Sequence, residues 1–216
     1  MTRLVLSAII LLSLMGCAVN ENTYWTVTDS DAYWVRSGYS IKPPSGSDWV
    51  KLPTDEKAPN SISFMKGEGV YNRGSTSDTF IYFKGTLALA TGTQLKDPIQ
   101  DRADKDRLAA TLQEFLNRYW STTIKDHSYE TLSGADCLKY SGNSKIRRPS
   151  LGQSDLNIEQ VRGYFCLHPK NNNFGVIMET RNFVTTGSHV SDRDNQIDHF
   201  FSSLSFTYPP TVSGAH

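Results

Sequence analysis

Cys17 is the residue whose surroundings most clearly predict a chemical modification. It follows Arg3 and an apolar run over Leu4–Leu14, which has the length of a signal-peptide core and is shorter than a membrane-spanning helix of about 20 residues. The run ends in Leu14-Met15-Gly16-Cys17, with a branched apolar residue three positions before the cysteine and a small residue directly before it. This pattern suits a peptidase that cleaves before a lipid-modified thiol. We therefore expect residues 1–16 to be removed as a signal peptide and Cys17 to carry lipid.

These four residues resemble the lipobox of bacterial lipoproteins, although Met15 is bulkier than the usual residue at its position. In that class, a diacylglycerol on the sulfur and an acyl chain on the freed amine hold the protein on a membrane far more strongly than one myristoyl chain. The next residue is Ala18 rather than aspartate, which for a Gram-negative source implies the periplasmic face of the outer membrane. The alternatives are an ordinary secretory signal with an incidental cysteine and an uncleaved anchor.

Cys137 and Cys166 remain as an even pair once Cys17 is assigned to lipid, and the expected compartment is oxidising. We predict a disulfide between them. In the loop-entropy model, closing a loop of about 30 residues contributes roughly 3.5 kcal/mol of stability. Two buried free thiols are the alternative, and zinc is less favoured because the pair is not C-x-x-C and lacks partner ligands at useful spacing.

Arg147 and Arg148 are the best candidates for binding an anion, because a guanidinium group matches a carboxylate or phosphate with two parallel hydrogen bonds. The alternative is a solvated loop, since both lie in a long polar stretch over 142–160 that we expect to leave a sheet edge. Trp49 and Trp120 are candidates for contact with a glycan, with packing in the core as the commoner role of such side chains.

The sequence holds no motif of a known enzyme class, such as G-x-S-x-G, Walker A or H-E-x-x-H. His199 follows Asp198 directly on a predicted helix, where neighbouring side chains point in different directions, so a catalytic dyad is disfavoured. His189 with Asp192 and Asp194 is a weak candidate metal site that a solvated helix start explains better. We predict no catalytic residue, no cofactor and no metal, and we favour a protein that is not an enzyme.

Composition and charge favour a single domain on a tether. Removing the signal from the 216 residues leaves 21 basic and 22 acidic residues, a balance that argues against binding nucleic acid. We expect a lipidated tether over 17–37, one domain over 38–206 and a disordered tail over 207–216. The aromatic residues of the tether are expected to pack on the domain, with the membrane interface as the alternative.

Apolar periodicity predicts several strands and two amphipathic helices. Spacings of three and four from Leu108 predict a helix over 97–123, and a capping pattern at Ser191 predicts a second helix that ends near Leu204. Asn171-Asn172-Asn173 predicts the tight turn of a hairpin that carries Cys166. Strands are expected at 38–42, 61–66, 79–90, 129–132, 136–141, 163–168, 174–182 and 204–206, with a loop over 67–78.

The order of these elements resembles the PsbP-like family and its Ran-binding relatives. The resemblance covers residues 38–206 and rests on Tyr39-Ser40-Ile41 before two prolines, Trp49 shortly after, and the closing segment Phe200–Phe206. It implies an α+β fold in which an antiparallel β-sheet is flanked by helices on both faces, an α/β/α sandwich; the predicted elements agree with such layers, and a different α+β sandwich is the alternative. The family implies adaptors and assembly factors, without catalytic residues to transfer.

Two classes of function are compatible with these observations. We favour a noncatalytic lipoprotein, held on the membrane by its N-terminal lipid, that binds or helps to assemble another envelope protein through its sheet edge or the 142–160 segment. The alternative is an envelope hydrolase or small-ligand carrier whose site is built from scattered residues. A pocket with converging polar groups and a shifted acid or histidine would favour the alternative, whereas an apolar surface patch would favour the first class.

Overall fold

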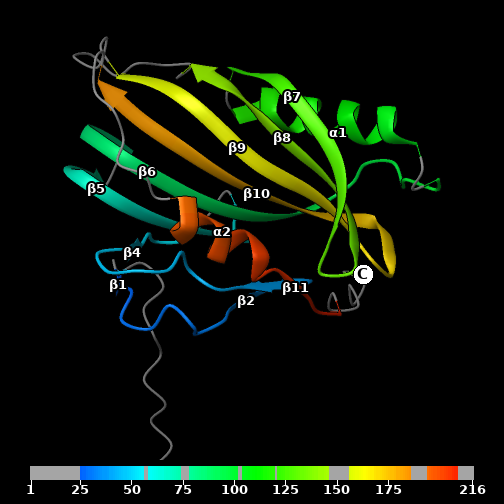
Figure 1. Cartoon of the computed structure of the whole chain (residues 1–216), viewed down its shortest axis with the longest axis horizontal. Helices are drawn as coiled ribbons and strands as arrows, with labels where there is room; N and C mark the ends of the chain where they lie inside the picture. Colours follow the sequence, from blue (N-terminus) through cyan, green and yellow to red (C-terminus); the bar gives the residue numbers. More distant parts are fainter. Residues whose placement is uncertain are drawn as a thin grey trace, which may run out of the picture.

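The main feature of the molecule is an eight-stranded antiparallel sheet in the order β1-β4-β5-β6-β10-β9-β8-β7 (Figure 1). The computed structural model describes residues 25–55, 58–73, 78–101, 104–119, 121–145, 156–185 and 194–208. Two very short strands, β1 (Trp25–Thr26) and β4 (Val50–Lys51), form one edge. The long strands are β5 (Ser61–Arg73), β6 (Asp78–Gln94), β7 (Ser121–Leu132), β8 (Ala135–Lys145), β9 (Leu156–His168) and β10 (Asn171–Thr185).

A second, three-stranded sheet brings the two ends of the described chain together. Its order is β11-β3-β2, with β11 (Ser205–Phe206) and β2 (Trp34–Arg36) on either side of β3 (Tyr39–Ile41). The described residues also form two helices, α1 (Lys105–Tyr119) and α2 (Asp194–Ser202). Within the described residues, no helix has the length and hydropathy needed to span a membrane.

Both faces of the large sheet are apolar, because successive residues of a strand point to opposite faces. On β10, Val176 and Met178 belong to one buried cluster with α2 and the small sheet, whereas Ile177 between them belongs to a second cluster with α1. The first cluster includes Tyr39, Ile41, Trp49, Phe64, Ala88, Ile197, Phe200 and Phe201. The second includes Leu108, Leu112, Leu116, Leu138, Tyr140, Val161 and Phe165.

The expected α/β/α sandwich is wrong, because the protein is mostly β. Helices α1 and α2 contain 15 and 9 residues, which at 1.5 Å per residue gives lengths of about 22 and 14 Å. Strand β6 has 17 residues and is about 56 Å long at 3.3 Å per residue. Each helix therefore covers a patch of one face rather than forming a layer, and Figure 1 shows α2 sharing its side with the small strands.

Both helices are shorter than predicted. The N-terminus of α1 is set by Asp104, whose carboxylate accepts a hydrogen bond from the backbone N–H of Arg107 at 3.0 Å, so the helix does not begin at 97. Residues 121–123, predicted as helix, belong to β7, where Thr122 is buried and pairs with Ser144 of β8. The helical spacing of apolar residues continues by chance into a strand whose neighbour supplies its hydrogen bonds.

The eight predicted strands are present: the six over 61–182 are longer than predicted, whereas β3 and β11 are shorter. The short strands β1, β2 and β4 were not predicted. Strands β5 and β6 pair over residues predicted as a loop, with Gly67 opposite Gly85. A Cβ atom on Gly85 would collide with the backbone of Lys66, so only glycine allows this approach. The hairpin of β9 and β10 is present, but its turn lies at Pro169-Lys170 rather than at 171–173, which begin β10 and precede a shift in register before Gly175. The side chain of Asn171 accepts a hydrogen bond from the backbone N–H of Asn173 at 2.9 Å.

Candidate binding cleft

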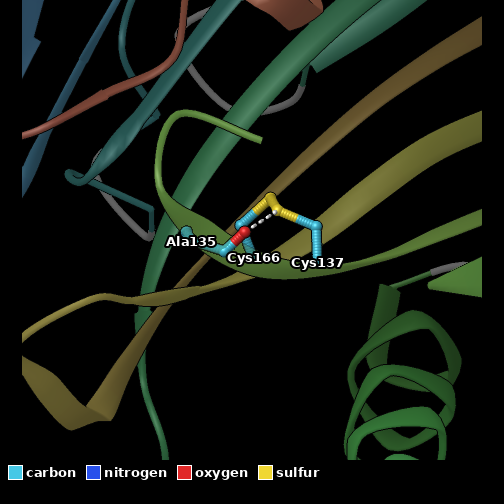
Figure 2. Close-up of a disulfide and its surroundings, with 3 residues drawn as sticks. All are labelled: Ala135, Cys137 and Cys166. Carbon is cyan, nitrogen blue, oxygen red and sulfur yellow. Dashed lines mark hydrogen bonds between the residues drawn. A yellow bond between two sulfur atoms is a disulfide. The ribbon is translucent and has the colours of Figure 1, made fainter. Parts of the chain in front are cut away.

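The predicted disulfide between Cys137 and Cys166 is present (Figure 2). The two residues lie directly opposite each other on β8 and β9, with Cα atoms 4.1 Å apart and both side chains buried in the cluster that contains α2. Ala135, whose carbonyl oxygen lies 3.5 Å from the Cys137 sulfur, directly follows the turn between β7 and β8. The bond therefore fixes the end of the sheet at which this turn lies.

A two-residue turn at that end presents Ser133 to solvent. Ser133 and Gly134 have φ angles of 51° and 74°, and Leu132 pairs with Ala135 on either side of them. Positive φ at both central positions is the geometry of a type I′ hairpin turn, which suits the twist of antiparallel strands. A serine adopts this backbone conformation less readily than glycine or asparagine does.

A buried ion pair lies under the other face of the sheet. The Arg181 guanidinium donates to the Glu179 carboxylate through Nη2 at 2.6 Å and Nε at 3.1 Å, and the two side chains are 0% and 2% exposed. Tyr140 donates its hydroxyl proton to the other oxygen of Glu179 at 2.8 Å. Burial, followed by the nearby Glu179 charge, raises the pKa of Tyr140 well above its usual value.

The cluster of Glu179, Arg181 and Tyr140 is extended by two buried hydroxyl groups. Arg181 Nη1 donates to Ser144 Oγ at 3.2 Å, and Thr122 Oγ1 donates to the same oxygen at 3.1 Å. The hydrogen bonds connect β7, β8 and β10 through side chains across the sheet, and solvent does not reach them. The arrangement can hold three strands in register, but it offers no open position for a ligand.

A cleft of about 450 Å³ opens where the chain ends meet, and we call it the terminal cleft. It is lined by the turn after β9, the segment from the end of α2 through β11, the β7–β8 turn and Tyr33. Its volume lies in the range of about 300–1,000 Å³ that is usual for small-molecule sites. The lining residues are Tyr33, Ser133, His168, Pro169, Lys170 and the continuous run Ser202–Tyr208.

His168 holds the two walls of the terminal cleft together. Its Nε2 atom lies 2.9 Å from the carbonyl oxygen of Thr207, and its Nδ1 atom accepts a hydrogen bond from the backbone N–H of Lys170 at 3.1 Å. A neutral ring with its proton on Nε2 satisfies both contacts. The ring also packs edge-on against Phe206, with centroids 5.2 Å apart. His168 is therefore a buried structural residue whose two nitrogens are already engaged.

Hydroxyl groups from separate parts of the chain face the terminal cleft. Ser205 and Thr207 lie two residues apart on either side of Phe206, so they share the side of the segment opposite to the core. Within the described part of the chain, the side chains of Ser133, Ser205 and Thr207 make no hydrogen bond. These hydroxyls are free to donate to and accept from a ligand.

Two tyrosine rings stand at the rim of the terminal cleft. Tyr33 and Tyr208 are 53% and 78% exposed, and each ring has a lysine ammonium over it: Lys42 at 5.2 Å from the centroid of Tyr33 and Lys170 at 5.0 Å from that of Tyr208. Lys170 also donates to the Tyr208 hydroxyl at 2.9 Å, and this hydrogen bond, followed by the lysine charge, lowers the pKa of Tyr208. The lysines orient the rings without burying them.

The terminal cleft has a small net positive charge. No aspartate or glutamate is among its lining residues, and Lys170 is their one formal charge when His168 is neutral. A smaller cavity of about 160 Å³ beside α1 differs in this respect, because Lys96, Asp97, Arg107 and Glu114 line it with balanced charges. The terminal cleft alone of these two combines exposed rings, unpartnered hydroxyls and an excess of positive charge.

The sheet edge at β7, proposed from the sequence as a contact surface, is protected against strand addition. Its pairing with β8 is interrupted by a bulge between Ile124 and Asp126, and Lys125 and Asp126 are exposed there. Charges and bulges on an edge strand disfavour the addition of another strand.

Several residues predicted as site candidates from the sequence lie outside the described residues: Cys17, Trp120, Arg147, Arg148, His189 and Asp192. Of the others, Trp49 is buried in the core and donates its indole N–H to Gln196 at 3.1 Å, so its glycan role is wrong. His199 contacts the carbonyl oxygen of Ser30 at 3.1 Å, and Asp194 pairs with Arg162 at 2.6 Å. No group of three or more metal-ligating side chains occurs within the described ranges.

The aromatic residues of the predicted tether divide between two roles. Trp34 packs edge-on against Phe64, with ring centroids 6.1 Å apart, as predicted. Trp25 and Tyr33 remain exposed, although β1 and β2 pair their segment with β4 and β3. Tyr33 therefore becomes part of the cleft, a role that the sequence did not suggest.

No family model matches the chain, and no curated protein matches it. Among solved structures, LpqN of Mycobacterium tuberculosis, described as involved in cell envelope biogenesis, is a weak structural neighbour. The two chains are 14% identical, the match covers 86% of this chain and 90% of that one, and the TM-score is 0.43. We infer nothing about the function of this chain from so loose a likeness. The PsbP-like resemblance has no family-model match and stays a prediction.

Proposed function

We propose that the protein is a noncatalytic binding module of the bacterial cell envelope, anchored by lipid on Cys17, with the terminal cleft as its binding site. The observation that carries the proposal is the set of unpartnered hydroxyls and exposed rings around one open cleft. The rings of Tyr33 and Tyr208 are exposed, and burying a large apolar side chain contributes about 1.5–3 kcal/mol of free energy. Occupancy by a ligand or partner would recover part of that energy.

Binding is favoured over catalysis because of how the imidazole at the cleft is held. Proton transfer needs a ring nitrogen that can reach a reacting group, and both nitrogens of His168 are occupied by backbone atoms of Thr207 and Lys170. The Glu179–Arg181 pair is enclosed in the sheet and cannot reach a substrate. The terminal cleft is therefore suited to binding a ligand rather than to transferring a proton to it.

The envelope location rests on the sequence between Arg3 and Ala18 and on the disulfide. A disulfide persists in an oxidising compartment, as expected outside the cytoplasm. The outer membrane, through its periplasmic face, is the location we propose for a Gram-negative source. Trp25 lies eight residues after Cys17, so a fully extended tether would hold the domain within about 28 Å of its anchor.

Site-specific photocrosslinking in intact cells tests this proposal. The full chain is expressed with a photoreactive residue in place of Ser205 in the cleft, or in place of Thr123, which is exposed on β7 and serves as the matched control. We expect a discrete crosslinked species from position 205 and none from position 123. Identical patterns at both positions, or no species at 205, would contradict the cleft as the binding site.

Mass spectrometry of the native product tests the anchor in the same cells. We expect a chain that begins at Cys17 and carries three acyl chains, and we expect Cys17→Ser to abolish both the acylation and the membrane association. An unmodified Cys17 in membrane fractions would overturn the lipid anchor. It would leave the crosslinking result intact, because the cleft lies in the folded part of the chain.

A further inference from the structure

The side chains of the terminal cleft select a class of ligand, an inference that rests on the proposed function. We propose that the terminal cleft binds a saccharide that carries a carboxylate. The rings of Tyr33 and Tyr208 provide stacking surfaces, the hydroxyls of Ser133, Ser205 and Thr207 provide hydrogen bonds, and Lys170 recognises the acid.

The hydroxyl groups indicate a ligand rich in polar groups that both donate and accept. Serine and threonine hydroxyls can take either role by rotation, which is the property needed opposite the hydroxyls of a sugar. Ser203 is less available, because its hydroxyl already donates to the carbonyl oxygen of Phe200 at 2.7 Å and accepts from the backbone N–H of Lys42 at 2.9 Å. Ser133, Ser205 and Thr207 are the groups that remain for the ligand.

The exposed rings indicate that this polar ligand also has apolar faces. A pyranose ring presents a row of C–H bonds on one face, and these are attracted to the negative face of an aromatic ring. Tyr33 comes from the N-terminal segment and Tyr208 follows β11, so the rings approach the cleft from different parts of the chain. A flat polar ligand with C–H faces fits this pairing better than a lipid does, because Leu204, the aliphatic lining residue, is buried in the core.

The charges of the cleft decide between neutral, basic and acidic saccharides. The absence of aspartate and glutamate from the lining residues leaves nothing to attract a cation. Lys170 is exposed and bonds to a neutral phenol, so its positive charge can pair with a carboxylate. One lysine is too little for a polyanion such as nucleic acid, whose binding depends on neutralising many phosphates.

Titration calorimetry on the full mature chain, lipidated and held in detergent, tests the inference. Three tetrasaccharides serve as probes: neutral chitotetraose, the same backbone with N-acetylmuramic acid in alternate positions, and tetragalacturonate. We expect both acidic probes to bind more tightly than chitotetraose, by about 1.4- to 5-fold, because an exposed ion pair is worth about 0.2–1 kcal/mol. The preference should decline as salt rises.

Variants separate the contributions of the rings and the charge. Tyr33→Ala and Tyr208→Ala should each weaken binding of all probes by about 2- to 12-fold, the equivalent of one aromatic contact. Lys170→Gln should remove the preference for acidic probes while retaining the binding of chitotetraose. The matched controls are Trp25→Ala, an exposed ring outside the cleft, and Lys125→Gln, an exposed lysine on β7; both should bind like the native chain.

Each outcome decides for or against the inference. Binding of both acidic probes identifies the carboxylate as the recognised group, and binding of the muramic acid probe alone also supports the inference and identifies the source as a peptidoglycan strand. Absence of binding by all probes, or equal losses in the control variants, overturns it. A protein crosslinked at position 205 in the absence of saccharide binding would overturn the saccharide and leave the proposed function standing. Failure of that crosslink would refute the proposed function itself.

Discussion

The buried pair of Glu179 and Arg181 permits a sharp test of how the sheet is held together. Replacing Glu179 by leucine leaves the Arg181 guanidinium fully buried without its carboxylate partner, while its contact with Ser144 Oγ on β8 at 3.2 Å is retained. Removing one partner of a buried ion pair costs about 3–5 kcal/mol. We expect Glu179→Leu to fall at the upper end, because a guanidinium cannot lose its proton. Arg181→Leu should cost about 3 kcal/mol, because a buried carboxylate can escape its charge by protonation.

The double variant Glu179→Leu/Arg181→Leu distinguishes pairing from packing. All variants of this series are compared in a Tyr140→Phe background, which removes the hydroxyl that bonds to Glu179. With both charges removed, no uncompensated ion remains, and the loss relative to that background should fall to about 2 kcal/mol or less. The interaction energy between the two sites should then be at least about 2 kcal/mol. Urea denaturation measures each step, and with a slope of about 2 kcal/mol per molar Glu179→Leu should lower the midpoint of unfolding by about 2.5 M.

The exposed carboxylate of Asp126 provides the control for this series. Asp126→Asn on the edge strand should change the free energy of unfolding by less than about 0.5 kcal/mol. The reasoning would be refuted if the two leucine substitutions were additive, because an additive result would mean that the charges do not compensate each other in the folded state.

Three further predictions concern the disulfide, the buried phenols and the β7–β8 turn. Cys137→Ser/Cys166→Ser should lower the free energy of unfolding by roughly 3.5 kcal/mol, and a dithiol reagent should shift the native chain by the same amount in urea but leave the variant unchanged. Burial raises the pKa of Tyr39 and Tyr140, so their contribution to stability is fully present below the unfolded tyrosine pKa of about 10 and is lost as the pH rises above that value. Phenolate absorbance should show that these two groups ionise only when the protein unfolds. Ionisation of either phenol in the folded protein would contradict this prediction. Gly134→Ala should cost about 1 kcal/mol through its positive φ, whereas Ser133→Asn should raise the melting temperature slightly, and equal melting temperatures for the two variants would contradict the turn assignment.

Local sequence patterns predicted where the strands and the disulfide lie, but they did not predict the lengths of the strands and helices. Alternation at 61–66 and 174–182 located β5 and β10, because one face of each strand contacts a core. The loop predicted at 67–78 is largely paired, because glycines that disfavour a strand in isolation allow the close approach of Gly67 to Gly85. The fold class was wrong because helix periodicity shows which face is apolar but not how much of a sheet that face can cover.

The terminal cleft could not be predicted from the sequence. Its hydroxyls and rings come from positions 33, 133, 168–170 and 202–208, which have no fixed spacing and no motif in common. The Ser133-Gly134 pair between two strands is a signal of a tight turn, but nothing in it indicates that Ser133 would lie beside β11. Likewise, Glu179 and Arg181 are two residues apart on one strand, which places them on the same face, yet their burial depends on α1 and β8.

The pairing of β11 with β3 makes completion of the small sheet depend on residues 205 and 206. Ser205 pairs with Ser40, and the backbone N–H of Thr207 donates to the carbonyl oxygen of Gly38 at 3.1 Å, so the strand in the middle of the small sheet lacks one neighbour until residues 205–207 have been synthesised. Contacts this distant along a chain form late and slowly. The small sheet is therefore expected to form after the hairpin of β9 and β10, whose strands are adjacent in the sequence.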